Sequence, residues 1–279
     1  MPQRDDSSVH HLVELGYVDP DEEAARVVAA RERQRRALRQ AAELAAQGRL
    51  AEAATLLETL AADDSEWVSP RRLLAEIYYR QGRCTQAQDQ LDWLAFRGIE
   101  HPRLALLAGA LALHRADLQS AREWLEYARH VAPDLSGVQT LTGTLLLRLG
   151  RVDEAARSFE RAVQQNANDA AALAGQAAVF LRRGQYEEAA DWALRALEQD
   201  MQLFRAHVHL GLALAQLGRP KEALQALEIS AKTDPTRSAP YRWLRRIAEE
   251  QLGDAPRAAR YRQLGQEVIH HRRERRRSG

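Results

Sequence analysis

Small and apolar residues recur along this chain with a step of 34 residues, and four such columns keep the same register. The first column is alanine, at positions 53, 87, 121, 155, 189 and 223. The second is glycine, at positions 48, 82, 150, 184 and 218, with Ala116 at the one place that lacks glycine. A fixed period of this length is typical of proteins built from repeated supersecondary units.

The two remaining columns combine small residues with mostly bulkier apolar ones. The small column contains Ala41, Ala75, Gly109, Gly143, Ala177 and Gly211. The bulkier column contains Leu44, Tyr78, Ala112, Leu146, Phe180 and Leu214. Together the columns predict two antiparallel helices in each unit. Small residues let the two backbones approach closely, larger ones fill the remaining space, and the glycine occupies the turn, where a positive φ is often needed.

The register divides most of the chain into units. Six regular units are predicted at residues 34–67, 68–101, 102–135, 136–169, 170–203 and 204–237, and a seventh at 238–265. The seventh departs from the pattern, because Arg245 occupies its small column and Gly253 comes one residue late. A terminal repeat with an atypical, polar face is the expected cap of a repeat stack. We therefore predict a helical repeat domain over residues 20–265.

The sequence resembles the tetratricopeptide repeat family. One unit carries the family pattern in Leu210, Gly211, Leu214, Gly218, Ala223, Leu227, Asp234 and Pro235. Another carries it in Thr142, Gly143, Leu146, Gly150, Ala155, Phe159 and Ala162. The resemblance covers about residues 34–265. It implies an all-α fold, a right-handed superhelical solenoid of antiparallel helix pairs.

The segments that flank the repeats are predicted to be less regular. Residues 1–19 form an N-terminal segment, and its first few residues are expected to be disordered. A helix is expected from Pro20 to about Gln47, because proline is favoured in a first helical turn. After the repeats, residues 266–279 form a basic tail, which is expected to fray from Arg272.

Charge is balanced over the chain but concentrated at its end. The formal net charge is +1, whereas the last twenty residues carry seven arginines and two glutamates. No global field therefore attracts nucleic acid or membranes. The chain begins with polar residues and contains no run of 18 apolar residues. We accordingly expect neither a leader peptide nor a spanning helix, and a cytoplasmic location.

The sequence contains none of the common catalytic motifs. It lacks a nucleotide-binding glycine loop, His-Glu-x-x-His, Cys-x-x-Cys and Gly-x-Ser-x-Gly. Its paired histidines, such as His270 and His271, are adjacent, and adjacent side chains point apart on a helix, which does not suit a metal site. The single cysteine, Cys84, excludes an intramolecular disulfide. We predict no enzyme activity, no metal and no cofactor.

In the family that this chain resembles, the first helices of successive units line a concave groove. The resemblance implies that residues at one place in the unit form a row along this groove. Two residues before the turn position, the row reads Arg80, His114, Arg148, Arg182 and Gln216. With neighbouring groove-facing places added, the predicted partner-binding residues are Arg72, Arg80, Leu107, His114, Leu141, Arg148, Arg182, His209, Arg242 and Arg246.

The predicted groove is apolar in its middle, with arginine along one side. Arginine offers planar, paired donors to carboxylates, so the expected partner is an acidic and partly hydrophobic segment of another protein. A structural alternative stays open, because a cation near a helix C-terminus also interacts favourably with the helix dipole, by about 0.3–1 kcal/mol. Some family members bind chaperone tails through asparagine and lysine on the first helices, and that clamp is missing here.

Two other functions are weighed against partner binding. The stretch from Leu12 to Val18 resembles the closing segment of sulfatase and alkaline-phosphatase-like hydrolases, which implies an accessory repeat module of such an enzyme. The basic tail is the other candidate, because its arginines could bind nucleic acid or an anionic surface with steep salt dependence. The oligomeric state is left open.

Overall fold

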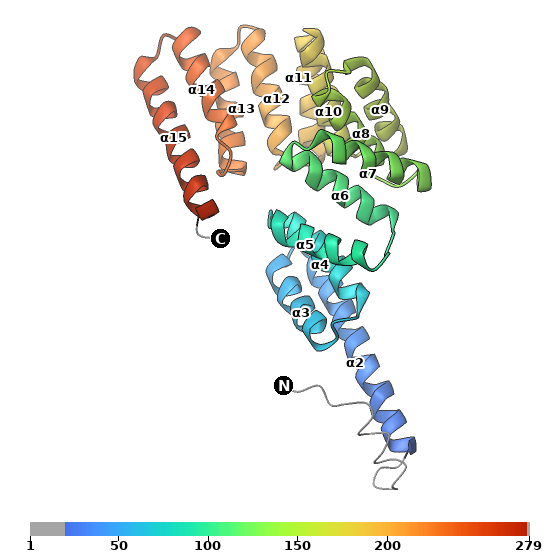
Figure 1. The fold of residues 1–279 in the computed structure, drawn as a ribbon. Coiled ribbons are helices and arrows are strands. Elements are labelled where there is room, and N and C mark those ends of the chain that lie inside the picture. Colours follow the sequence, from blue (N-terminus) through green and yellow to red (C-terminus); the bar gives the residue numbers. More distant parts are fainter. Residues whose placement is uncertain (1–19, 278–279) are drawn as a thin grey trace. The chain divides into compact units, whose positions relative to one another are not determined.

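The computed structural model describes residues 20–277, which contain fourteen α-helices and no strand (Figure 1). The helices are α2 (Pro20–Ala46), α3 (Leu50–Asp63), α4 (Val68–Arg80), α5 (Cys84–Phe96), α6 (Pro102–Arg115), α7 (Leu118–Val131), α8 (Val138–Arg148), α9 (Val152–Gln165), α10 (Ala170–Arg183), α11 (Tyr186–Gln199), α12 (Phe204–Gln216), α13 (Pro220–Thr233), α14 (Ala239–Glu250) and α15 (Ala255–Arg277). The predicted all-α repeat fold is confirmed.

Each predicted unit contains one pair of helices, and the turn between them adopts the conformation that the glycine column indicated. Gly150, for example, has φ +77° between α8 and α9. Ala116 occupies the same place between α6 and α7 and has φ +63°, although its Cβ disfavours that region. The repeat therefore imposes the turn conformation even where the sequence does not supply glycine.

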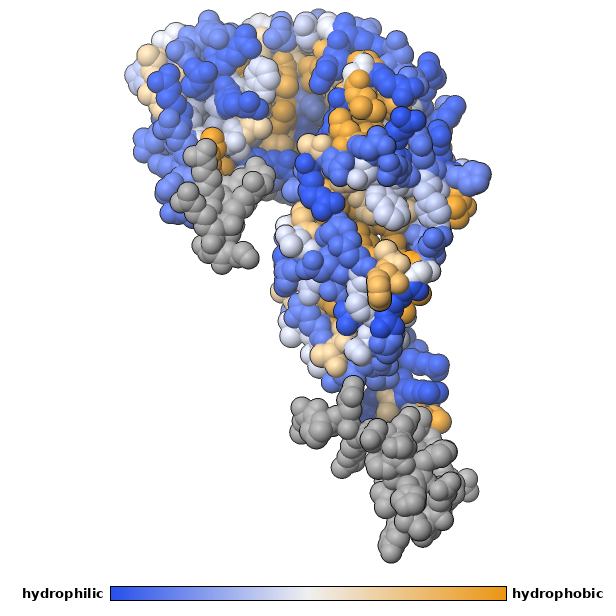
Figure 2. All heavy atoms as spheres, viewed as in Figure 1, coloured by the Kyte–Doolittle hydropathy of each residue, from blue (hydrophilic) through white to orange (hydrophobic). Residues whose placement is uncertain are grey.

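The described residues form two compact parts, which divide within α6 between Leu111 and Ala112. In the first part, α2 to α5 and the start of α6 share one hydrophobic core, which includes Leu57, Leu74 and Leu94. In the second part, the first helices of successive units contact each other, α8 with α10, α10 with α12, and α12 with α14. These four helices therefore lie next to one another in chain order. The side of the molecule seen in Figure 2 is mostly hydrophilic, with apolar residues exposed in several places.

The alanine column lies at the closest helix contacts in both parts. All six of its members, Ala53, Ala87, Ala121, Ala155, Ala189 and Ala223, have no exposed surface. The small column serves the same purpose on the first helices. A Cβ added to Gly211 would lie 2.6 Å from Cγ of Leu227 and 3.1 Å from the carbonyl oxygen of Ala223. Small residues are thus required where the two helices of a unit pack, as the sequence predicted.

The C-terminal helix differs from the prediction. The predicted boundary at residue 266 falls inside α15, which continues past Arg272 to Arg277, and the fraying expected from Arg272 stays a prediction. Tyr261 anchors α15 to α13, since its hydroxyl donates a hydrogen bond to Glu228 and accepts one of 2.8 Å from Nε of Arg257. Burial and the neighbouring carboxylate raise the pKa of Tyr261 to about 12. The disorder expected in the first residues of the chain lies outside the described residues.

Candidate partner-binding groove

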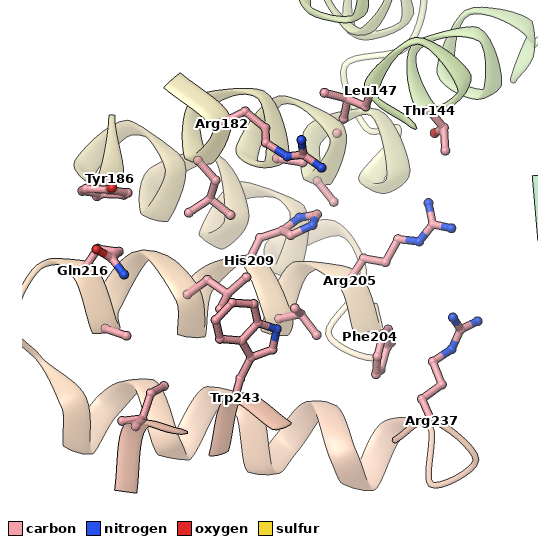
Figure 3. A pocket seen from close by; sticks show the side chains of 18 of the residues that line it. Thr144, Leu147, Arg182, Tyr186, Phe204, Arg205, His209, Gln216, Arg237 and Trp243 are labelled. Atoms are coloured by element: carbon pink, nitrogen blue, oxygen red, sulfur yellow. The ribbon is translucent and has the colours of Figure 1, made fainter. Parts of the chain in front are cut away.

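A cavity of about 720 Å³ opens on the face that α8, α10, α12 and α14 share. Figure 3 shows that α10 contributes Arg182 to its lining, α12 contributes Phe204, Arg205 and His209, and α14 contributes Trp243. Because all these elements belong to the second part, the cavity is formed within one compact body. Its size falls in the range of ligand pockets in proteins, roughly 300–1,000 Å³.

The cavity has an apolar centre with an aromatic residue at its base. Trp243 is half-buried and packs against the core that α12, α13 and α14 share. Val208 and Leu212 line the cavity from α12. Two arginines lie against aromatic rings at its edge, Arg246 at 5.8 Å from the centre of the Trp243 ring and Arg237 at 5.0 Å from that of Phe204. Such contacts hold guanidinium groups beside apolar surface.

Positive charge dominates the rim of this cavity. Five arginines line it, at positions 148, 182, 205, 237 and 246, whereas Glu250 is its one carboxylate. Glu250 is already neutralised, because Nε of Arg246 donates to it at 2.8 Å. Arg182 forms no hydrogen bond or ion pair with any residue in the described range. An anionic ligand would therefore find at least one unengaged guanidinium here.

His209 lies between these arginines as a neutral side chain. Burial, with a smaller contribution from the positive charge of Arg205, lowers its pKa to about 4, although an interaction with the backbone of Ala174 partly opposes this shift. Its Nδ1 atom is buried and has no hydrogen-bond partner. In Figure 3 the imidazole of His209 and the guanidinium of Arg182 point to the same side of the cavity. The centre of the site thus combines a neutral ring, whose Nδ1 lacks a partner, with an unpaired cation.

Two arginines of the row that lies two residues before the turn, Arg80 and Arg148, form hydrogen bonds to the preceding unit. Arg80 donates a hydrogen bond of 3.1 Å from Nη1 to the carbonyl oxygen of Ala45, and Arg148 donates to that of Leu113. Each acceptor lies near the end of the preceding unit's first helix, where carbonyl groups lack partners within the helix. These two arginines therefore join successive first helices. Arg182 stands at the equivalent place without such a bond.

The structure distributes the ten predicted groove residues over several surroundings. Four of them, Arg148, Arg182, His209 and Arg246, line the cavity. Three more belong to the second part but do not line it, namely His114, Leu141 and Arg242. The remaining three, Arg72, Arg80 and Leu107, belong to the first part.

Four prominent lining residues escaped the prediction from sequence, namely Phe204, Arg205, Arg237 and Trp243. Arg237 lies in the connection between α13 and α14, and Trp243 lies in the irregular last unit. Neither position belongs to a regular column. Trp243 follows the predicted Arg242 directly, so an aromatic residue next to a predicted basic one was an available signal.

Residues 20–277 contain no group of three or more histidines, cysteines, aspartates or glutamates that could hold a metal ion. Among the helices of that range, none combines the length and the apolar character that crossing a membrane requires.

Comparison of the sequence with known families gives a clear match. Residues 72–135, 140–203 and 204–237 match the tetratricopeptide repeat, and these segments make up more than half of the chain. A curated relative is the small glutamine-rich tetratricopeptide repeat-containing protein 2 of Mycosarcoma maydis. It is 32% identical over 82 residues, which are 29% of this chain and 23% of that protein.

Solved structures share the same architecture at low sequence identity. A chain of the APC/C hetero-tetramer Cut9–Hcn1 matches with a TM-score of 0.65 and 16% identity, over 76% of this chain and 42% of that one. A tetratricopeptide repeat protein from Parabacteroides merdae matches with a TM-score of 0.60 and 15% identity, over 84% and 93% of the two chains. At these identities the likeness concerns the fold.

Proposed function

Because the chain belongs to the tetratricopeptide repeat family, a family of protein-interaction scaffolds, we propose that it binds a segment of a partner protein in the groove of α8, α10, α12 and α14. The observation that carries this proposal is the combination of an apolar cavity centre with an unpaired arginine at its rim. No catalytic step is assigned to the groove.

The proposed ligand is a peptide or helix that is acidic and partly hydrophobic. A large apolar side chain would pack on Trp243 and Val208, where it would displace water from apolar surface. A neighbouring carboxylate would pair with Arg182, and charge-assisted hydrogen bonds of this kind contribute about 1.5–3 kcal/mol. The neutral ring of His209 offers one further polar contact between these two anchors.

The two alternative functions that the sequence suggested, a hydrolase module and a nucleic-acid or anionic-surface binder, depend on residues outside the groove. The stretch that resembles hydrolases, from Leu12 to Val18, lies outside the described residues. The arginines of the basic tail lie on α15, but their side chains, at residues 272, 273 and 275–277, also lie outside the described range. The groove is therefore the feature for which the described side chains offer specific contacts.

Selection of peptides from a random display library against the whole chain tests the proposal. We expect the selected peptides to carry acidic residues next to a large apolar one. Arg182→Glu should weaken their binding about tenfold or more, because it replaces a charge-assisted bond by a repulsion. Trp243→Leu should weaken it through lost aromatic surface.

The matched control is Arg262→Glu, which changes the same charge at an exposed position of α15 away from the cavity. Its binding should remain as in the wild type. Peptides that bind all three variants equally, while circular dichroism shows intact helices, would refute recognition in this groove.

A further inference from the structure

A second cleft lies on helices α7, α8 and α9, and none of its lining residues lines the groove cavity. Its volume is about 310 Å³, less than half that of the groove cavity. Residues of α7, α8 and α9 line it, and its apolar lining includes Leu145 of α8 and Leu149, which directly follows that helix. A space of this size suits a small molecule or a single modified side chain more than a folded segment.

The residues that line this cleft carry more positive than negative charge. Five arginines and two glutamates line it. Arg122 pairs with Glu126 at 2.9 Å, and Arg151 pairs with Glu154 at 2.6 Å through both of its donor atoms. These pairs leave both carboxylates occupied.

Three arginines remain without a counter-charge. Arg129, Arg157 and Arg161 line the cleft from opposite walls and form no hydrogen bond or ion pair with any described residue. The hydrogen bond from Arg151 keeps the pKa of Glu154 below its usual value, and the positive charge of Arg157 adds to this effect. The charge of Arg157 therefore acts inside the cleft. The cleft thus has three positive charges that an anion can neutralise.

One neutral hydrogen-bonding group of the cleft is buried and unused, because the hydroxyl oxygen of Thr142 on α8 has no partner. Gln139 and Ser158 also line the cleft, and neither side chain forms a hydrogen bond within residues 20–277. Buried polar atoms are ordinarily satisfied, so the Thr142 hydroxyl in a basic cleft favours a polar ligand.

We propose that this cleft binds a phosphate monoester. A phosphoryl group carries close to two negative charges and three acceptor oxygens at neutral pH, and guanidinium groups match its geometry. Arg129, Arg157 and Arg161 supply the charge, and the hydroxyl of Ser158 on α9 donates a hydrogen bond. The apolar residues Leu145 and Leu149 leave room for the organic part of the ester. This site is independent of the groove and of the partner proposed for it.

Titration calorimetry of the whole chain with inorganic phosphate, at constant ionic strength, tests the proposal. We expect saturable binding that weakens about tenfold or more in the Arg157→Gln, Arg161→Gln double variant, which removes two charge-assisted contacts. Ser158→Ala should weaken it less. Affinity for a phosphate monoester should also fall as the pH drops below about 6, where the ester loses its second charge.

Two further titrations distinguish the sources of the phosphate. Glycerol 3-phosphate stands for a small phosphorylated molecule, and a phosphoserine peptide with its unphosphorylated counterpart stands for a modified partner protein. Whichever binds more tightly than inorganic phosphate identifies the source.

The control is Arg262→Gln, which changes an exposed and unpaired arginine of α15. It should leave phosphate binding unchanged. The proposal is wrong if phosphate gives no saturable heat at millimolar concentrations, or if the control weakens binding as much as the double variant does. The groove proposal rests on other residues and is tested with peptides, so failure here would leave it standing.

Discussion

Phe159 of α9 is held between two glycines of neighbouring helices, and a methyl group added to either glycine should push against its ring. The ring is 1% exposed. A Cβ built on Gly175 of α10 would lie 2.5 Å from Cδ1 and Cζ of the ring, and a Cβ on Gly143 of α8 would lie 2.8 Å from Cε1. Both distances are far below the optimum for two carbon atoms, roughly 3.5–4.0 Å.

Two opposing effects set the expected size of the change. An alanine in place of glycine inside a helix gains about 1 kcal/mol when nothing obstructs it. Forcing one extra carbon into a filled core costs about 1–3 kcal/mol. At Gly175 the added carbon would lie about 1 Å or more inside the optimal distance between two carbon atoms, which is about 3.5–4.0 Å. We therefore expect Gly175→Ala to destabilise the protein by about 1–2 kcal/mol and Gly143→Ala by less.

A double-mutant cycle with Phe159→Leu, measured by urea denaturation and circular dichroism, isolates the contact. In the Phe159→Leu background the ring is gone, so Gly175→Ala should become neutral or stabilising by up to about 1 kcal/mol. If Gly175→Ala stabilises the wild-type background by the same amount, the ring does not fill the space beside Gly175 and the packing argument fails.

Two other predictions follow from single residues. Ala116→Gly should stabilise the chain by up to about 1 kcal/mol in urea denaturation, because glycine relieves the positive φ, whereas Gly82→Ala at the equivalent turn should lower stability. Burial keeps the pKa of His209 near 4 in the folded state, against 6.5 as its ordinary value. The unfolded chain therefore binds more protons between these pH values, so stability should fall as the pH drops from 6.5 towards 4, by at most about 3 kcal/mol. Subtracting the pH profile of His209→Gln should reveal this loss, and identical profiles would contradict a neutral, buried ring.

The periodic part of the fold could be predicted because each column answers a local physical requirement. A turn with positive φ favours glycine, and a close contact between helices favours alanine, so both requirements produce residues that recur at a fixed spacing. The division between Leu111 and Ala112 has no comparable sequence signal, since the columns continue on both sides of it. The length of α15 also escaped prediction, because its anchor joins Glu228 to Tyr261, two residues in different units.

The groove was harder to predict because equivalent positions do not have equivalent contacts. Arg148 and Arg182 occupy the same place in successive units, yet Arg148 donates to the carbonyl of Leu113 while Arg182 is unpaired. The spacing of the repeat does not distinguish these two arrangements. Trp243 and Arg237 enter the cavity from the irregular last unit and from a connection. Recognition in this chain should therefore depend on an arginine of the row that the fold leaves unpaired and on residues outside the 34-residue period. Substitutions of Arg182 and Trp243 should change binding more than a substitution of Arg148, which donates to the carbonyl of Leu113.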